Sequence, residues 1–394
     1  MRVAVATHFY PPEPGAGALR VRSMVDAFAA AGHDVTVVTT FPSFPSGAFS
    51  ERRRPFVRVE RNGRVRVVRL NSILVPRMPG GRLLHWLTAA LSASLYLLAT
   101  RDHFDVVVIS SPPITLSLPG LVGAARHGAR LIVDVRDVFP DLGVALGVWK
   151  KDGLVVRALG NLVRRLYRRA DLVVVVTPHG QSQIAARGVD PSRIVLARNA
   201  YERSPLLAEY SRPRNGFTAI YAGNLGLTTD VDVLADAAAL VAADNITIEI
   251  VGDGAQRTRL GERIEHEGIG NLRLKGSFPR QEALAMVASA DVSIVPLRKG
   301  LTESIPTKLY DSLSVGCPVV VAAEGEAIQE GTSLGALCTP AGDAEALAAV
   351  LRQLSVTDRS ALRKLGETGK SRLQSLADRS DIMAALVGRI AALS

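Results

Sequence analysis

Cysteine and aromatic residues are scarce in this sequence. Among its 394 residues there are two cysteines, Cys317 and Cys338, and aromatic side chains make up 5% of the chain. The cysteines form no metal-binding pattern and lie in apolar or turn contexts, so we expect unreactive thiols in a reduced, cytosolic protein. The low aromatic content and the lack of a recognisable nucleic-acid-binding module argue against nucleic acid as a partner.

Two further absences limit the cofactors that the chain could bind. The turn after the strand expected at 3–7 holds Gly15 and Gly17 but lacks the G-x-G-x-x-G spacing of a dinucleotide-binding site. It is a tight turn that needs small residues, or a turn that contacts a ligand. Neither an Asp-x-Asp pair nor a cluster of histidines is expected to offer ligands for a metal ion. We therefore expect neither a metal nor any other cofactor.

One stretch, residues 83–100, is uncharged over the length of a helix. Its length reaches the lower limit for a membrane span, but His85, Thr88 and three further hydroxyl side chains lower its hydropathy. It also lies between strands of a repeating α/β pattern. We therefore expect a buried or interfacial helix rather than a transmembrane one.

Positive charge is concentrated in the first half of the chain. Residues 1–200 hold 27 lysines and arginines against 13 acidic residues, a net charge of +14, whereas residues 201–394 hold 20 against 24. The arginines gather at 52–69 and in a helix expected at 153–170. This asymmetry predicts that the first half meets an anionic surface, and a membrane is a better candidate than nucleic acid.

Within the basic segment, residues 57–70 alternate Val with Arg or Glu. A period of two predicts a hairpin of strands with one cationic face. That face either binds an anion or is simply solvated.

The remaining sequence reads as two series of βα units. Short apolar strands are expected at 3–7, 35–39, 104–109, 131–135 and 172–177, and then, after a Pro- and Ser-containing linker at 203–215, at 217–221, 246–251, 292–295 and 319–321. Continuous apolar runs of this length are typical of parallel strands buried on both faces. With 394 residues, two α/β domains are the default.

The stretch from Val292 to Val321 carries the strongest signal for a site. A strand, a loop with Glu303, a helix opened by Pro306 and a second strand follow one another. Lys308 and Asp311 share one face of that helix at i and i+3. A helix N-terminus beside a lysine suits a diphosphate, and carboxylates suit sugar hydroxyls. The alternative is a surface helix with a solvated lysine and a capping glutamate.

This stretch resembles a known enzyme family. Glu303 and Asp311 bracket seven residues, which resembles the E-x7-E element of family 4 retaining glycosyltransferases, with Asp in the second place. The Ile-Pro-Thr-Lys segment before Leu309 resembles the P-S-K signature of a subgroup that builds bacterial envelope, O-antigen and capsule polysaccharides. The resemblance implies that Glu303 contacts the transferred sugar, Asp311 the ribose, and Thr307 and Lys308 the diphosphate.

The resemblance extends over nearly the whole chain. The catalytic positions that it implies are Glu303, Lys308 and Asp137, and the donor-binding positions are Gly15, Ala16, Gly17, Gly223, Asn224, Leu225, Gly226, Gly252, Gly254, Ser277, Phe278, Arg298, Pro306, Thr307 and Asp311.

Two departures from the family pattern stand out. Arg136-Asp137 replaces the His-Asp pair that many relatives carry. Members of the family also usually hold the donor's diphosphate with an Arg and a Lys, a cationic clamp; here Asn224, Thr229 and Asp230 occupy those places. Lys308, with Arg298, would then have to carry the charge. Asp137 would orient an acceptor hydroxyl; alternatively Asp137 or Asp141 caps the next helix.

The resemblance implies a GT-B fold, an α/β class with two Rossmann-like parallel-sheet domains facing an interdomain cleft. The domains expected are an acceptor-binding domain at 1–203, a nucleotide-sugar-binding domain at 204–375, and a C-terminal helix at 376–394 that returns to the first domain.

The expected function is metal-independent, retaining transfer of a sugar from a nucleotide sugar, with uridine as the family's preferred base. The expected acceptor is a lipid-linked saccharide, which the enzyme would meet at the inner face of the cell membrane through the basic first domain. Two alternatives stay open: a sugar-nucleotide 2-epimerase of GT-B fold, and a non-catalytic protein that binds sugar nucleotides.

Overall fold

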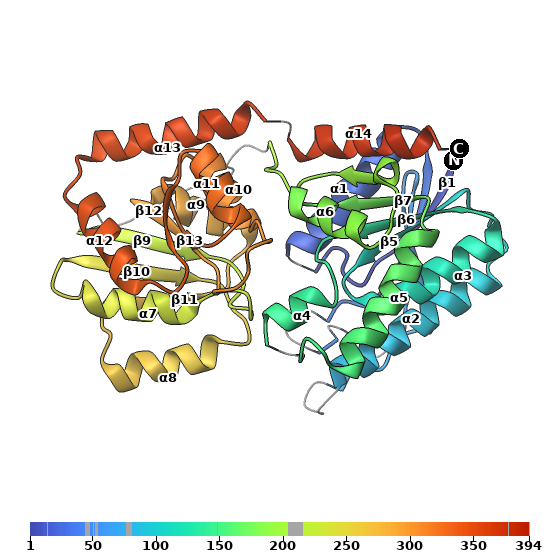
Figure 1. Ribbon diagram of the computed structural model, residues 1–394, viewed down its shortest axis with the longest axis horizontal. Helices are drawn as coiled ribbons and strands as arrows, with labels where there is room; N and C mark the ends of the chain where they lie inside the picture. The colour runs from blue at the N-terminus through green and yellow to red at the C-terminus, as the bar shows by residue number, and fades with distance from the viewer. Residues whose placement is uncertain are drawn as a thin grey trace. The chain divides into compact units, whose positions relative to one another are not determined.

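The computed structural model describes the chain apart from Pro14, 44–47, Ser50, 52–53, 76–80, Val148, 204–215, Ala377 and Ser394. It divides into two compact units (Figure 1). The first unit comprises residues 1–199 together with 379–394, and the second comprises residues 200–378. The predicted linker at 203–215 lies almost wholly outside the described residues.

The first unit is built on an eight-stranded sheet with the order β3-β4-β2-β1-β5-β6-β7-β8. Its strands are β1 (Arg2–Ala6), β2 (Asp34–Thr40), β3 (Val57–Asn62), β4 (Val65–Leu70), β5 (Val106–Ser111), β6 (Arg130–Val135), β7 (Leu172–Val175) and β8 (Ile194–Leu196). The strands are parallel except for β3, which pairs antiparallel with β4 at the edge. The Val- and Ile-rich runs form the central strands because both of their faces are covered.

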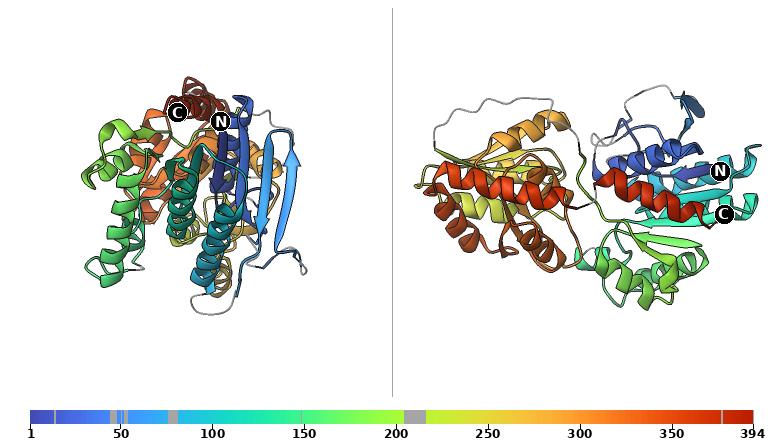
Figure 2. Two further views of the ribbon diagram at one scale, coloured as in Figure 1. Left: turned by 90° about the vertical axis from the view of Figure 1, so that its right-hand side faces the viewer. Right: turned by 90° about the horizontal axis from the view of Figure 1, so that it is seen from above.

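Helices cover both faces of this sheet. They are α1 (Ala16–Ala30), α2 (Gly81–Ala99), α3 (Ser117–His127), α4 (Asp141–Ala145), α5 (Leu154–Arg169), α6 (Pro178–Ala186) and α14 (Arg379–Ala391), with short 3₁₀ turns at Ile114–Leu116 and Pro191–Arg193. On one face, α1 packs against the final helix α14, whose Met383 and Ile390 are fully buried in the same core as Phe28. On the other face lie α2, α3 and α5 (Figures 1 and 2).

The helix predicted at 83–100 is present as α2. Ala93 and Leu97 on one side of it join the core beneath the sheet. Within the described part of the chain, none of the helices combines the length and the apolar character that a membrane crossing needs.

The predicted hairpin is present, but its single cationic face is not. Register pairs Arg58 with Arg69 on one face and Arg61 with Arg66 on the other, so the arginines are divided between the two sides. Most of them also have acidic partners: Glu51 for Arg58, Asp34 for Arg64, Asp102 for Arg66 and Glu60 for Arg69. The prediction of a single face fails because the arginines lie three residues apart within each strand, at 58 and 61 and at 66 and 69, whereas side chains on one face of a strand recur every two residues. Positions 52 and 53 lie outside the described residues.

The second unit is built on a six-stranded parallel sheet with the order β11-β10-β9-β12-β13-β14. Its strands are β9 (Phe217–Ala222), β10 (Ile246–Val251), β11 (Leu272–Gly276), β12 (Val292–Pro296), β13 (Val319–Ala323) and β14 (Leu337–Pro340). Its helices are α7 (Val231–Leu240), α8 (Arg257–Glu267), α9 (Arg280–Ser289), α10 (Thr307–Ser314), α11 (Glu326–Ser333), α12 (Ala344–Ser355) and α13 (Arg359–Gln374). The helices α7 and α12 share a core on one face, and α10, α11 and α13 share a core on the other.

A buried ion pair joins three segments of the first unit. Arg20 of α1 contacts Asp134 of β6 through two nitrogens, at 3.0 Å from Nε and 2.7 Å from Nη2 to Oδ1. The exposed fraction of the two side chains is 2% and 0%. Arg20 Nη1 also donates to the carbonyl of Ala197, just after β8, at 2.9 Å. A sequence pattern gives no sign of this pair, because its partners lie on elements far apart in the chain.

We expect Asp134→Ala to destabilise the first unit by about 3–5 kcal/mol, because the substitution leaves the Arg20 guanidinium buried and unpaired. Asp26→Ala is the matched control: it removes the partner of Arg22 on the same helix, but that pair is half exposed and worth under about 1 kcal/mol. Chemical denaturation followed by tryptophan fluorescence measures the difference, since both tryptophans, Trp86 and Trp149, lie in the first unit. Equal losses of stability in the two variants would contradict the expectation.

Candidate active site

Each sheet has a point at which the order of strand addition reverses. In the first unit it lies between β1 and β5, and in the second between β9 and β12. Ligands of open α/β proteins bind at the carboxyl ends of the strands that flank such a point. The predicted site residues of each unit lie beyond the carboxyl ends of these strands or of their neighbours β6, β10 and β11.

In the second unit, glycines bring two backbone turns together beyond β9 and β10. A Cβ atom placed on Gly252 would lie 1.9 Å from the carbonyl oxygen of Gly223, and one placed on Gly254 would lie 2.6 Å from that of Leu225. Both glycines have positive φ, at 148° and 155°. The turns can therefore approach each other only without side chains at these positions.

Lys308 lies over the first of these turns. A Cβ on Gly223 would lie 2.1 Å from Lys308 Cε, and Lys308 Nζ lies 5.3 Å from the ring centroid of Tyr221. No described carboxylate forms an ion pair with this ammonium. The Tyr221 ring supports the cation through its π face, which leaves the charge available to an anion.

The helix that carries Lys308 begins at the same place. Pro306 is the N-cap of α10 and Thr307 its first residue, and no side chain caps the helix. Its first N–H groups have no partner within the helix and carry the positive end of the helix dipole. A lysine and a helix N-terminus repel each other slightly, so their meeting at one point favours an anion such as a diphosphate.

Asp311 has a partner that the sequence did not reveal. Its Oδ1 lies 2.9 Å from Nη2 of Arg280, the first residue of α9, and the same nitrogen lies 3.7 Å from Glu202. An arginine therefore already holds the Asp311 carboxylate in place. Arg280 is a second cation at this end of the sheet. The only sequence signal for it was that it follows the Gly276-Ser277-Phe278 segment by two residues.

Four other predicted positions, Ser277, Phe278, Arg298 and Glu303, follow the strands at the same end of the sheet. The carbonyl of Gly276 accepts from the Gly252 N–H at 2.8 Å, which starts the Ser277-Phe278 segment beside the glycine turns. Arg298 donates its N–H to the Thr228 carbonyl at 3.1 Å, and its side chain is exposed. Glu303 is half-buried on the loop between β12 and α10.

The residues of the Gly223–Gly226 turn differ in burial and in their contacts. Leu225 is fully buried in the core, its N–H donates to the Asp253 carbonyl at 2.9 Å, and its carbonyl accepts from the Gln256 N–H at 3.1 Å. These contacts assign Leu225 to the interior of the unit rather than to a ligand contact. Asn224 is exposed, and its side chain lies over Gly254.

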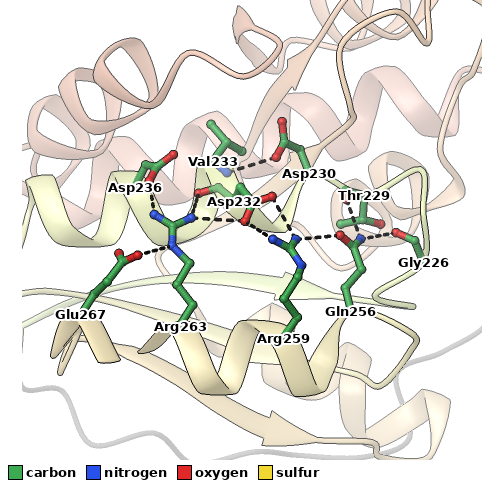
Figure 3. A network of polar contacts seen from close by, with 10 residues as sticks. All are labelled: Gly226, Thr229, Asp230, Asp232, Val233, Asp236, Gln256, Arg259, Arg263 and Glu267. Atoms are coloured by element: carbon green, nitrogen blue, oxygen red, sulfur yellow. Dashed lines mark hydrogen bonds and ion pairs between the residues drawn. The ribbon is translucent and has the colours of Figure 1, made fainter. Parts of the chain in front are cut away.

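A polar network on α7 and α8 fixes this turn (Figure 3). Gln256 Nε2 donates to the carbonyls of Gly226, at 2.5 Å, and Thr229, at 3.0 Å. Its Oε1 accepts from Arg259 at 3.1 Å, and Arg259 in turn makes two hydrogen bonds of 2.9 Å with Asp232. The side-chain amide of Gln256 thereby connects the loop to α8, and through Arg259 and Asp232 to α7, so the loop is held in place by both helices.

The expectation that the chain offers no Asp-x-Asp pair is wrong: the sequence holds Asp230-Val231-Asp232, and the network accounts for both carboxylates. Asp230 caps α7 by accepting from the Val233 N–H at 3.1 Å. Hydrogen bonds from Arg259 lower the pKa of Asp232. Among the described residues, no group of three or more His, Cys, Asp or Glu side chains could hold a metal ion. Metal independence stays a prediction.

In the first unit, Gly15, Ala16 and Gly17 form the start of α1. Gly15 is the N-cap, with a φ of 116° that favours glycine. A Cβ on Gly17 would lie 2.0 Å from Nη1 of Arg136, so the guanidinium occupies the space that a side chain would need. Arg136 donates through Nη2 to the Pro112 carbonyl, and its Nε is buried without a partner.

Asp137 follows Arg136 at the carboxyl end of β6. Burial raises the pKa of its carboxyl, and the neighbouring Arg136 charge opposes the rise. The alternative of a helix cap is wrong for both aspartates: α4 begins at Asp141 with Pro140 as its N-cap, no side chain caps it, and Asp141 pairs with Arg187 at 2.5 Å. Capping of α4 therefore does not account for the presence of Asp137 at this position.

The glycine turns give a direct test of the second unit. We expect Gly252→Ala to abolish nucleoside diphosphate binding and to lower the melting temperature, because the new methyl group would overlap the Gly223 carbonyl. Gly261→Ala is the control: this glycine lies inside α8, its Cβ would meet only Leu274 at 3.7 Å, and Ala should add about 0.5–1 kcal/mol of stability there. Calorimetric titration and thermal unfolding report the two effects. If Gly252→Ala kept its affinity for nucleoside diphosphates, the close approach of the Gly223 and Gly252 turns would not be needed for binding.

Comparison with known proteins agrees with this architecture. Residues 15–200 match the family model of the glycosyl transferase 4-like domain, and residues 216–356 match that of the glycosyl transferases group 1. The putative colanic acid biosynthesis glycosyl transferase WcaI of Escherichia coli K12 is 26% identical over 358 residues, which cover 86% of each chain.

Two solved structures share the fold over the full length of both chains. They are the sucrose-phosphate synthase of Thermosynechococcus elongatus, with a TM-score of 0.78 and 19% identity, and Anabaena HepE in complex with UDP-glucose, with a TM-score of 0.68 and 14% identity. Both units match glycosyltransferase models, and the transferase activity is thereby favoured over the epimerase and the non-catalytic binder. The chain belongs to the family 4 glycosyltransferases of GT-B fold.

Proposed function

We propose that this glycosyltransferase moves a sugar from a UDP-linked donor to a lipid-linked saccharide, with retention of anomeric configuration and without a metal ion, in the synthesis of a cell-envelope polysaccharide. The observation that carries the proposal is the position of Lys308: its ammonium, which no described carboxylate pairs, lies on the Gly223 turn at the N-terminus of α10. A nucleotide sugar has a diphosphate to fill such a position. Uridine is supported by the resemblance and by the UDP-glucose bound to HepE.

The donor would bind to the second unit. Lys308 and the first N–H groups of α10 would hold the diphosphate, and Asp311, fixed by Arg280, would accept hydrogen bonds from the ribose. Glu303 would contact the transferred sugar. As the bond between the anomeric carbon and the diphosphate breaks, these cationic groups would stabilise the charge that develops on the leaving oxygen.

The acceptor would bind to the first unit, with its hydroxyl oriented by Asp137. The acceptor oxygen forms the new bond to the anomeric carbon on the face that the diphosphate leaves. The hydroxyl proton passes to the departing phosphate oxygen, so no protein carboxylate attacks the sugar. The products are the extended saccharide and a nucleoside diphosphate.

The envelope setting and the membrane are parts of the same proposal. WcaI is named for colanic acid biosynthesis, and the first half of this chain carries a net charge of +14. The helix α5 holds five arginines and no acidic residue, and none of the five forms an ion pair with a described residue. Such a helix would attract anionic lipid by about 1 kcal/mol for each arginine near the surface. The enzyme would therefore dock peripherally on the cytoplasmic face of the membrane.

Replacement of the lysine tests the donor site. We expect Lys308→Ala to lose roughly 10²–10³ in kcat, because a preorganised donor to the leaving diphosphate is gone. Lys299→Ala is the matched control, since this exposed lysine lies on the same loop and forms no ion pair with a described residue. Glu303→Gln should impair transfer while nucleoside diphosphate affinity stays near wild type. The assay offers UDP-, GDP- and ADP-sugars in turn, and product NMR reports the anomeric configuration.

Wild-type rates in both Lys308→Ala and Glu303→Gln would remove these residues from the site. An inverted product would contradict retention even if both variants were inactive.

The raised pKa of Asp137 gives a pH dependence. If the ionised carboxylate orients the acceptor, kcat/KM should fall as the pH drops through a pKa that lies above the usual range of an aspartate. Asp137→Asn should be slower and should lack this acid limb. Asp141→Asn, four residues on, loses a partner of Arg187 and should keep the limb. Superimposable pH profiles for wild type and Asp137→Asn would exclude Asp137 from this role.

A further inference from the structure

The outer face of α2 consists of leucine. Every described side chain of this helix that is exposed belongs to leucine, apart from Ala99. The exposed fractions lie between 47% and 54% for Leu83, Leu87, Leu91, Leu95 and Leu98. These positions recur at i and i+4, so they form one continuous stripe along the helix. A helix that faces water ordinarily carries charged or polar residues on that side.

The stripe is bordered by further apolar side chains. Ile73, 53% exposed, is held beside α2 because its N–H donates to Thr88 Oγ1 at 3.0 Å. Leu118, 47% exposed, begins the neighbouring helix α3. Scattered exposed leucines need no explanation, but a contiguous apolar surface on one face marks an interaction site.

The arginine helix lies on the same side of the sheet. Figures 1 and 2 show α2, α3 and α5 side by side along one face of the first unit. The exposed residues of α5 combine cations with apolar side chains, namely Arg157, Arg164, Arg165, Arg168 and Arg169 with Leu154, Val155 and Leu162. Cationic and apolar side chains together are typical of helices that lie in a lipid interface.

We propose that the leucine stripe of α2 inserts into the acyl boundary of an anionic membrane, with α5 held against the lipid headgroups beside it. This proposal rests on the proposed function in one respect: it names the surface by which the enzyme meets a membrane that holds its acceptor. The stripe from Leu83 to Leu98 is about 22 Å long at 1.5 Å per residue, so α2 would lie along the membrane plane.

Charge favours lipid over a second copy of the chain. A two-fold dimer through this face would bring two sets of five arginines to one interface, and neither α2 nor α5 contributes an acidic side chain to offset them. An anionic lipid surface complements both the arginines and the leucines.

Flotation with vesicles tests the surface in the full-length protein. The vesicles contain phosphatidylcholine with or without phosphatidylglycerol. We expect wild type to float only with phosphatidylglycerol, and the variant Leu87→Ser/Leu91→Ser/Leu95→Ser to lose roughly tenfold or more of its binding, because its apolar insertion is removed. All three leucines are exposed, so the variant should fold as wild type, which thermal unfolding checks.

The matched control is Leu240→Ser/Val356→Ser/Leu376→Ser, which replaces three exposed apolar residues of the second unit. It should float as wild type does. A separate probe reports insertion: in Leu91→Trp, lipids brominated on their acyl chains should quench the added fluorescence, whereas in Leu240→Trp they should not.

Two outcomes would overturn the proposal: wild type that does not float, or a serine variant of α2 that floats equally well. A wild-type dimer that becomes monomeric in the α2 variant would also overturn it, by assigning the stripe to self-association. Transfer to a water-soluble saccharide separates this proposal from the proposed function. The α2 variant should keep that activity, and its absence from wild type would contradict the function while leaving the flotation result intact.

Discussion

A basic side chain seated on a glycine is the constraint on which both candidate sites depend. In the second unit Lys308 occupies the space that a Cβ on Gly223 would need, and in the first unit Arg136 does the same at Gly17. Each cation is thereby held against a backbone turn at the carboxyl end of a central strand, next to the start of a helix. Any side chain at the glycine would displace the cation, so the position of the charge depends on the glycine in the turn.

This arrangement explains how the chain manages without the cationic clamp of its relatives. Asn224, Thr229 and Asp230 stand where the clamp is expected, and the structure gives two of them local tasks. Thr229 Oγ1 bonds the Asn224 carbonyl at 3.1 Å, and Asp230 caps α7. In the proposed site the charge would come instead from Lys308 on α10, which follows β12 across the switch point, and from Arg280 at the start of α9.

Sequence patterns predicted what depends on local chemistry. The strands, the helix opened by Pro306 and the glycine turns follow from apolar runs, from a fixed proline φ and from small residues at tight turns. Contacts between distant elements were not predictable. No spacing connects Arg280 with Asp311 or Gln256 with Gly226. The hairpin arginines Arg64 and Arg66 likewise pair with acids outside the hairpin, Asp34 and Asp102. The α5 arginines, by contrast, form no ion pair with any residue that the structure describes.

The location of α14 has a consequence for the order in which the chain folds during synthesis. Met383, Leu386, Val387 and Ile390 fill the core that α1 and the central strands of the first unit share. These residues leave the ribosome only after residues 200–378, which form the second unit. The first unit is thus completed only after the whole second unit has been synthesised. Until then its α1 face is an open apolar surface, the kind of surface that chaperones bind.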